Sequence, residues 1–132
     1  MAMNKKGFTL VELMLVVIII GVLVAMVAPR LAGRSEQAKI AAAHADINAN
    51  IASALDLYEV DNGSYPEGLN ALLEKPTNAP NWKGPYLKKK KLTDPWNNEY
   101  RYTSPGIHNK DYDLQSYGPD GVEGSDDIKN WE

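Results

Sequence analysis

Lys5-Lys6-Gly7-Phe8-Thr9-Leu10-Val11-Glu12 is the stretch of sequence that decides the fold of this 132-residue chain. It places two lysines and a glycine directly before an apolar run, residues 8–28, whose one charged residue is Glu12. At about 1.5 Å per residue, a helix over this run is about 31 Å long, which is one hydrocarbon thickness of a bilayer. The sequence therefore predicts a single membrane-spanning helix, and the lysines predict that its N-terminal side faces the cytoplasm.

Glu12 needs an explanation, because a carboxylate in a membrane helix costs about 2.5–3.5 kcal/mol on insertion scales and indicates a functional site. Two interpretations of residues 1–28 do not explain the presence of Glu12. A cleaved secretory signal has a shorter apolar stretch and a small-residue cleavage site after it, and no such site stands out in this sequence. An ordinary membrane anchor fits the length of the run but leaves the charge without a role.

Residues 7–12, Gly-Phe-Thr-Leu-Val-Glu, resemble the cleavage and methylation site of type IV prepilins and pseudopilins. The resemblance implies that residues 1–7 are a leader, that a prepilin peptidase cuts between Gly7 and Phe8, and that it methylates the new Phe8 amine. Glu12 would then pair with the Phe8 amine of a neighbouring subunit and set the axial register of an assembly. This interpretation is the one that gives Glu12 a role.

The helical pattern continues beyond the transmembrane and assembly half, residues 8–29, into an amphipathic half, residues 30–62. Pro29 should kink or loosen the helix, because it lacks a backbone donor and clashes with the preceding turn. The resemblance implies more, since in filaments of this family the stretch that Gly21 and Pro29 bound here is often unwound. We expect the helix to end at Asn62, with Gly63 as its left-handed cap.

Two faces can be distinguished on the amphipathic half from three- and four-residue spacings. One interpretation is that both faces cover the core of the head, residues 63–132. The other gives one face to the head and the other to neighbouring subunits. The small face consists of alanines 38, 42, 45, 49 and 52, and the bulkier face consists of Ile40, Ile47, Ile51, Ala54 and Tyr58.

The head is predicted to be a small antiparallel sheet lying across the long helix, so the fold class is α+β. Residues 66–74 are typical of a short helix opened by proline, whose leucines 69, 72 and 73 pack onto the long helix. Residues 99–103 and 110–116 alternate as strands of a hairpin joined by the loop 104–109, and a short strand near Leu92 is a further candidate.

The composition excludes several classes of protein and site. The chain has no cysteine and therefore no disulfide, and its net charge of −3 without clustered basic and aromatic residues argues against nucleic-acid binding. No nucleophile elbow, phosphate-binding glycine loop or paired metal-binding histidines are present, so we expect no enzyme. His44 and His108 are expected at the surface or in an interface. The lysine run 88–91 favours a solvated surface, with anionic lipid headgroups or an acidic partner as the alternative.

A second set of motifs narrows the resemblance to the major pseudopilins of the type II secretion system and thus to a type IV pilin-like fold. These motifs are Tyr65-Pro66, Gly68-Leu69, Asn81-Trp82, Gly84-Pro85-Tyr86, Asp94-Pro95-Trp96 and Tyr100. Asn97 stands where the family usually has glycine, and asparagine tolerates the left-handed conformation that such a turn needs.

The C-terminal loop, residues 117–127, concentrates four carboxylates among three glycines. Such carboxylates repel one another unless a cation lies between them, and calcium accepts six to eight oxygen ligands in flexible geometry. The missing cysteines and the distant His108 argue against zinc or copper, while a mobile acidic surface tail remains an alternative. The resemblance implies calcium ligands from the side chains of Asp120, Asp126 and Asp127, the backbone oxygens of Tyr117 and Val122, and an oxygen of Ser125. Ile128 and Trp131 would then pack back against the sheet.

The resemblance implies a structural subunit of the type II secretion pseudopilus, which polymerises in the bacterial inner membrane and drives export of folded periplasmic proteins. The head would be periplasmic, and the assembled pseudopilus would lie in the periplasm. Implied partners are other copies of the chain in a helical polymer, minor pseudopilins, the inner-membrane assembly platform, an assembly ATPase, prepilin peptidase and membrane lipid, but no nucleic acid. The alternatives are a type IV pilin for adhesion or motility and a membrane-anchored calcium-binding module.

Overall fold

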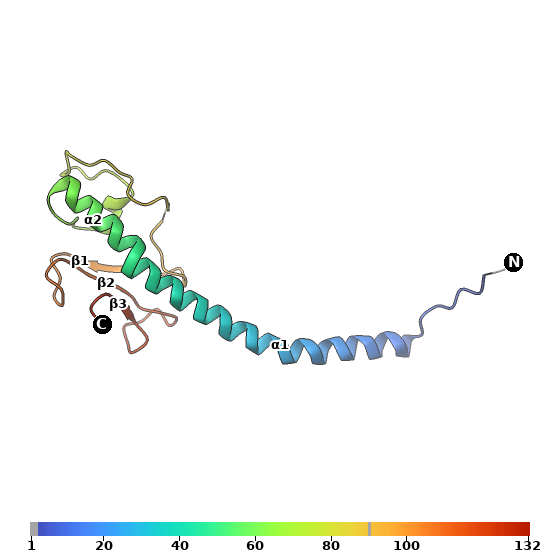
Figure 1. The fold of residues 1–132 in the computed structure, drawn as a ribbon. Helices are drawn as coiled ribbons and strands as arrows, with labels where there is room; N and C mark the ends of the chain where they lie inside the picture. The colour runs from blue at the N-terminus through green and yellow to red at the C-terminus, as the bar shows by residue number, and fades with distance from the viewer. Residues whose placement is uncertain (1–2, 90) are drawn as a thin grey trace. The chain divides into compact units, whose positions relative to one another are not determined.

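The computed structural model describes residues 3–89 and 91–132, which form two compact units (Figure 1). The N-terminal unit extends to Gln37, and the C-terminal unit comprises Ala38–Glu132. The elements in chain order are α1 (Leu10–Ala45), a π-helical turn (Asp46–Asn50), α2 (Ile51–Asn62), a 3-10 turn (Leu69–Leu72), β1 (Arg101–Thr103), β2 (Asp113–Ser116) and β3 (Ile128–Lys129). The predicted long helix followed by a small antiparallel sheet is therefore confirmed.

The N-terminal unit consists of an extended segment and the first part of α1, and its apolar side chains are exposed. The most apolar 18-residue window of the helix has a mean hydropathy of 3.1 and is 0% buried, so the helix is long and apolar enough to span a membrane. Pro29 lies inside α1 without ending it, so the helix is continuous through this residue, and the predicted kink or loosening stays a prediction. One missing donor leaves the other backbone hydrogen bonds in place, and good helix formers such as Met26 and Leu31 flank it. Unwinding between Gly21 and Pro29 in a filament stays a prediction.

A π-helical turn joins α1 to α2 in the C-terminal unit and keeps one helix face aligned with the core. The buried residues Ala43, Ile47, Ile51 and Leu55 recur every four positions. Four residues turn an α-helix through about 400°, so each step drifts by about 40° from the previous one. The π-turn inserts a wider turn that cancels much of this drift. The prediction of one uninterrupted helix did not include this turn.

The bulkier helix face is the one that covers the core, with one exception. Ile47, Ile51, Ala54 and Tyr58 are all buried, whereas Ile40 is 36% exposed. On the alanine face, residues 38, 42, 45 and 49 are exposed and residue 52 is half-buried. The interpretation in which both faces cover the head is therefore wrong, and the alanine face is free in the single chain.

The end of α2 follows the prediction, whereas the next helix is shorter than expected. Gly63 has a φ of 83°, and its N–H donates to the Glu59 carbonyl oxygen at 2.7 Å. The predicted helix over residues 66–74 is only the 3-10 turn, because Gly68 is extended, with a φ of −150° and a ψ of 156°. Leu72 is nevertheless fully buried, and leucines 69 and 73 pack against the core as expected.

The sheet has the order β1–β2–β3 with antiparallel pairs, and it lies beside the C-terminal part of the long helix (Figure 1). Tyr102 pairs with Leu114, which confirms the predicted hairpin, although both strands are shorter than predicted. The third strand is β3, whose Ile128 pairs with Ser116. The candidate strand near Leu92 was wrong, since that region contributes one isolated bridge between Thr93 and Glu99. Two residues of β3 are too few to show a strand period in the sequence.

Candidate functional site

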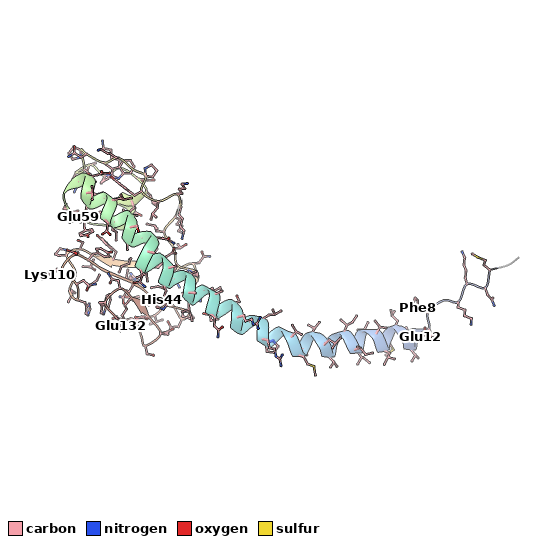
Figure 2. All side chains as sticks on the ribbon, in the orientation of Figure 1. Phe8, Glu12, His44, Glu59, Lys110 and Glu132 are labelled. Carbon is pink, nitrogen blue, oxygen red and sulfur yellow. The ribbon has the colours of Figure 1, made fainter. Side chains whose placement is uncertain are left out.

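Phe8 lies just ahead of α1, and Glu12 lies in its first turn (Figure 2). The Thr9 N–H donates to Glu12 Oε2 at 3.2 Å, and the Glu12 N–H donates to Thr9 Oγ1 at 3.2 Å. This reciprocal pair is a capping box, which satisfies two of the free N–H groups at a helix start. The spacing Thr-x-x-Glu before an apolar run is the sequence signal for this capping box.

The peptide bond before Phe8 lies in an exposed segment ahead of the helix. Phe8 is 90% exposed, and a Cβ added at Gly7 would meet no atom within 4 Å. A peptidase could therefore reach this bond without unfolding the helix. In the described residues Glu12 Oε1 has no hydrogen-bond partner, so the carboxylate can accept a further donor while Oε2 caps the helix.

The acidic loop, residues 117–127, is closed at both ends by the pairing of β2 with β3. Two of its glycines are left-handed, Gly118 with a φ of 73° and Gly121 with a φ of 69°. The Gly121 N–H donates to the Gly118 carbonyl oxygen at 3.3 Å. A non-glycine residue is strained at either position, so these glycines give the loop its tight course.

The structure holds the three predicted aspartate ligands in different ways. Asp120 Oδ1 accepts the Val122 N–H at 3.0 Å, and Asp127 Oδ1 accepts the Gly124 N–H at 3.1 Å. Asp126 packs on Gly118, where an added Cβ would lie 2.7 Å from the Asp126 carbonyl oxygen. Within residues 3–89 and 91–132, no three histidine, aspartate or glutamate side chains are grouped closely enough to hold a metal. The loop therefore brings Asp126 against Gly118 without gathering the carboxylates around one point.

One oxygen atom of this loop bears directly on whether a cation can bind there. Asp127 Oδ2 is buried and has no hydrogen-bond partner among the described residues. A buried, unpaired carboxylate oxygen is costly unless a donor or a metal ion satisfies it. Carboxylate and carbonyl oxygens are the ligands that calcium prefers, so the donor types in this loop and its unpaired Asp127 oxygen suit this ion, although the carboxylates are not gathered around one point. The backbone oxygens of Tyr117 and Val122 and the oxygen of Ser125 stay predicted ligands.

The buried Asp46 forms a hydrogen-bond network that was not predicted from the sequence. Its carboxylate accepts hydrogen bonds from Tyr100 Oη at 2.9 Å, Asn50 Nδ2 at 2.8 Å and Lys89 Nζ at 3.1 Å. Burial raises the pKa of Asp46, but the hydrogen bonds from Asn50, Tyr100 and Lys89 outweigh it and leave the pKa below its usual value. Burial, and then the hydrogen bond to Asp46, raises the pKa of Tyr100. A charged residue at a core-facing helix position was the available signal.

The lysine run 88–91 is therefore not purely a solvated surface. Lys89 is an ion-pair partner of Asp46, and its side chain is 52% exposed. Lys88 and Lys91 are exposed as expected, while residue 90 lies outside the described residues.

Asp113 organises the loop between β1 and β2. It accepts the backbone N–H groups of Ile107, His108 and Asn109 at 2.8–3.0 Å, and it contacts His108 Nδ1 at 2.9 Å. Burial raises the pKa of Asp113, but these hydrogen bonds outweigh it and lower the pKa to about 2. The His108 ring stacks on Trp131 at 4.2 Å between ring centroids. His108, half-exposed as a surface residue, thus also holds the C-terminal tail.

Two smaller expectations about the head can be compared with these contacts. Ile128 is buried as predicted, whereas Trp131 packs on His108 in the loop. Asn97 has a φ of 68°, which confirms the left-handed turn predicted after Trp96.

Two family descriptions cover nearly the whole chain. Residues 2–28 match the prokaryotic N-terminal methylation motif, and residues 30–131 match protein G of the type II secretion system. The chain belongs to the type II secretion protein G family. This pseudopilin is similar to the type II secretion system core protein G of Pseudomonas aeruginosa, with 48% identity over 98% of this chain and 96% of the relative. The core protein G of Escherichia coli K12 is 46% identical over 97% of this chain and 92% of its own length.

A solved structure that is similar to this chain supports the same family. The pseudopilin resembles the crystal structure of the major pseudopilin from the type 2 secretion system of enterohaemorrhagic Escherichia coli, with a TM-score of 0.60 and 38% identity. The match covers 78% of this chain and 95% of that one. The expected pilin-like fold is therefore confirmed.

Proposed function

We propose that this pseudopilin is a structural subunit that polymerises in the inner membrane into a helical pseudopilus and so drives folded periplasmic proteins through the outer membrane. The observation that carries the proposal is the start of α1, where an exposed apolar helix begins with a carboxylate that retains a free oxygen. Hydrocarbon or neighbouring helices must cover such a helix, and the carboxylate must find a positive partner there.

Cleavage after Gly7 would create that partner. Removing the leader leaves Phe8 with a free amine, and a methylated amine still carries a positive charge. Glu12 Oε2 remains tied to the Thr9 N–H, while Oε1 faces the amine of the neighbouring subunit. The ion pair would offset the cost of an unpaired carboxylate in the membrane and would fix the axial register between subunits.

The free alanine face would add to the contacts between subunits, because small side chains let helices approach closely. The chain has no nucleotide-binding motif, so an assembly ATPase would supply the energy through an inner-membrane platform. Minor pseudopilins would complete the polymer. The N-terminus would stay cytoplasmic and the head would lie in the periplasm. This role is structural, and nothing in it needs catalysis.

The experiment that tests the proposal is the mass of the purified mature chain after co-expression with a prepilin peptidase. We expect loss of Met1–Gly7 and one added methyl group on Phe8. A matched sample made without the peptidase should keep the leader. Retention of the leader in both samples would overturn the pseudopilin cycle and would leave an ordinary membrane anchor.

We also propose that the loop 117–127 holds calcium through Asp120, Asp126 and Asp127. The ion would supply the positive charge that these carboxylates lack and satisfy the buried Asp127 Oδ2. Calcium at 100 times its dissociation constant stabilises a folded state by about 2.7 kcal/mol, so chelation should lower the melting temperature by about 10–20 °C. Asp120→Ala should remove most of this increment, and Asp56→Ala, an exposed aspartate outside the loop, should not. An unchanged melting curve with and without calcium would count against the site.

A further inference from the structure

The turn that begins at Asp94 is tied to the acidic loop through a buried side chain. Asp94 is 4% exposed, and its Oδ1 accepts the N–H groups of Trp96 at 3.1 Å and Asn98 at 2.8 Å. Its other oxygen, Oδ2, accepts the hydroxyl of Ser116 at 2.7 Å. One carboxylate therefore closes its own turn with one oxygen and holds the end of β2 with the other.

Ser116 connects Asp94 to the acidic loop by a second hydrogen bond. It is the last residue of β2 and is 0% exposed. Its Oγ accepts the Gly118 N–H at 3.1 Å while donating to Asp94. A hydroxyl has one donor and two acceptor positions, so both bonds can exist at once and polarise each other. The result is a buried chain of hydrogen bonds from Gly118 through Ser116 to Asp94.

Gly118, at the end of this series of hydrogen bonds, lies against Asp126, a predicted calcium ligand. An added Cβ there would lie 2.7 Å from the carbonyl oxygen and 3.2 Å from Oδ2 of Asp126, so the two backbones are in close contact. The Asp94 turn also reaches the loop a second time, since an added Cβ at Gly121 would lie 3.0 Å from Asn98 Nδ2. Gly118 is thus hydrogen-bonded to the Asp94 turn through Ser116, and Gly121 lies close to Asn98 of the same turn.

We infer that Asp94 and Ser116 are positioning residues for the calcium loop: they fix Gly118 so that Asp126 is presented to the ion, although neither residue belongs to the predicted ligand set. Asp94 is not a spare ligand, because both of its oxygens already accept hydrogen bonds inside the protein. This inference rests on the proposed calcium site. It explains why the Asp-Pro-Trp turn and the acidic loop, which lie far apart in the sequence, belong to one functional unit.

The experiment compares calcium affinity in the full-length chain in detergent, by isothermal titration at a temperature where every variant is folded. Ser116→Ala removes the link between Gly118 and Asp94 and should weaken calcium binding by about tenfold, a loss of about 1.4 kcal/mol. Asp94→Asn keeps Oδ1 for its own turn but presents an amide donor to the Ser116 hydroxyl, so it should weaken binding less. Tyr102→Phe is the matched control, because it removes the bond from Tyr102 Oη to the Pro66 carbonyl oxygen at 2.7 Å, outside the loop.

The outcomes separate the inference from the site on which it rests. If the wild-type chain takes up no calcium, the proposed site itself is wrong. If the wild type binds and both Ser116→Ala and Asp94→Asn bind as tightly as Tyr102→Phe, the positioning role is overturned. A merely structural role would lower the melting temperature equally in chelator and in calcium and leave the affinity unchanged. If Ser116→Ala does not fold, the affinity of Asp94→Asn against Tyr102→Phe decides.

Discussion

The N-terminal and C-terminal units share the long helix α1 but differ in whether its apolar side chains are covered. In the N-terminal unit the helix exposes its apolar side chains, from Val16 at 48% to Leu10 at 74%. In the C-terminal unit the helix buries one face, and Ala43 is 0% exposed. The difference teaches that helical structure alone does not define a folded unit. The first segment needs lipid or other copies of the chain to cover it, whereas the second segment is covered by its own chain.

Carboxylates of the two units also differ in how many hydrogen bonds they accept from their own chain. The buried Asp46, Asp94 and Asp113 of the C-terminal unit each accept at least three hydrogen bonds from the same chain. Glu12, in the N-terminal unit, accepts one in the described residues. A carboxylate that its own chain satisfies serves the fold, while one that is left partly free is available to another molecule.

The largest expected effect comes from Glu12→Ala, which should abolish pseudopili while leaving the chain inserted in the membrane. The variant removes the charge that would pair with the Phe8 amine of the next subunit. Filaments are counted by electron microscopy in cells that overproduce the chain, with membrane fractionation as the control for insertion. Glu12→Gln keeps the acceptor for the Thr9 N–H, so its failure as well would assign the effect to the charge. Normal filaments from both variants would contradict the role of Glu12 in setting the axial register between subunits.

A pair of leucine substitutions compares the packing of the two units. Leu55→Ala in the C-terminal unit should destabilise it by about 2–5 kcal/mol, because Leu55 is 0% exposed and its removal leaves a cavity. Leu15→Ala in the N-terminal unit should leave the melting curve of the C-terminal unit unchanged, since Leu15 is 57% exposed. Denaturant titration in detergent, followed by tryptophan fluorescence, measures both. Equal losses would mean that the two units unfold together.

The Asp46 network allows a smaller and more specific test. Asp46→Ala leaves the buried Tyr100 hydroxyl without its acceptor and should cost about 1–3 kcal/mol of stability. Lys89→Ala removes only a half-exposed partner, so it should cost about 0–1 kcal/mol. The same denaturant titration compares the two. A larger loss for Lys89→Ala would show that the ion pair, rather than the buried hydrogen bond, holds this part of the fold.

The last expected effect is an acid dependence of the C-terminal unit. The pKa of Asp113 is about 2 in the folded chain and that of Asp46 is also lowered, so the unfolded chain binds more protons between pH 4 and pH 2. The stability from these groups is complete above their unfolded pKa of about 3.9 and is lost as the pH falls towards 2. Melting temperatures measured from pH 5 to pH 2 should fall, and Asp113→Asn should flatten that fall. An unchanged slope in the variant would contradict the assignment to Asp113.

Several details of the C-terminal unit could not be predicted because they depend on contacts between distant segments. The third strand, β3, has two residues and forms only because β2 is there to pair with it. Asp46 and Lys89 are 43 positions apart, and neither spacing nor composition relates them. The π-turn was in principle visible in the four-residue spacing of Ala43, Ile47, Ile51 and Leu55, because an α-helical face alternates three- and four-residue steps.

By itself, the sequence determined the features that depend on local spacing and composition. These are the membrane-length helix with Glu12 near its start, the glycine cap at its end, the β1–β2 hairpin and the left-handed Asn97. Each depends on a period or a backbone preference that a few neighbouring residues carry. Only the tertiary structure decided which helix face is buried, where the third strand lies, and that Asp94 reaches the acidic loop through Ser116. These features depend on side chains that are far apart in the sequence and meet only in the folded chain.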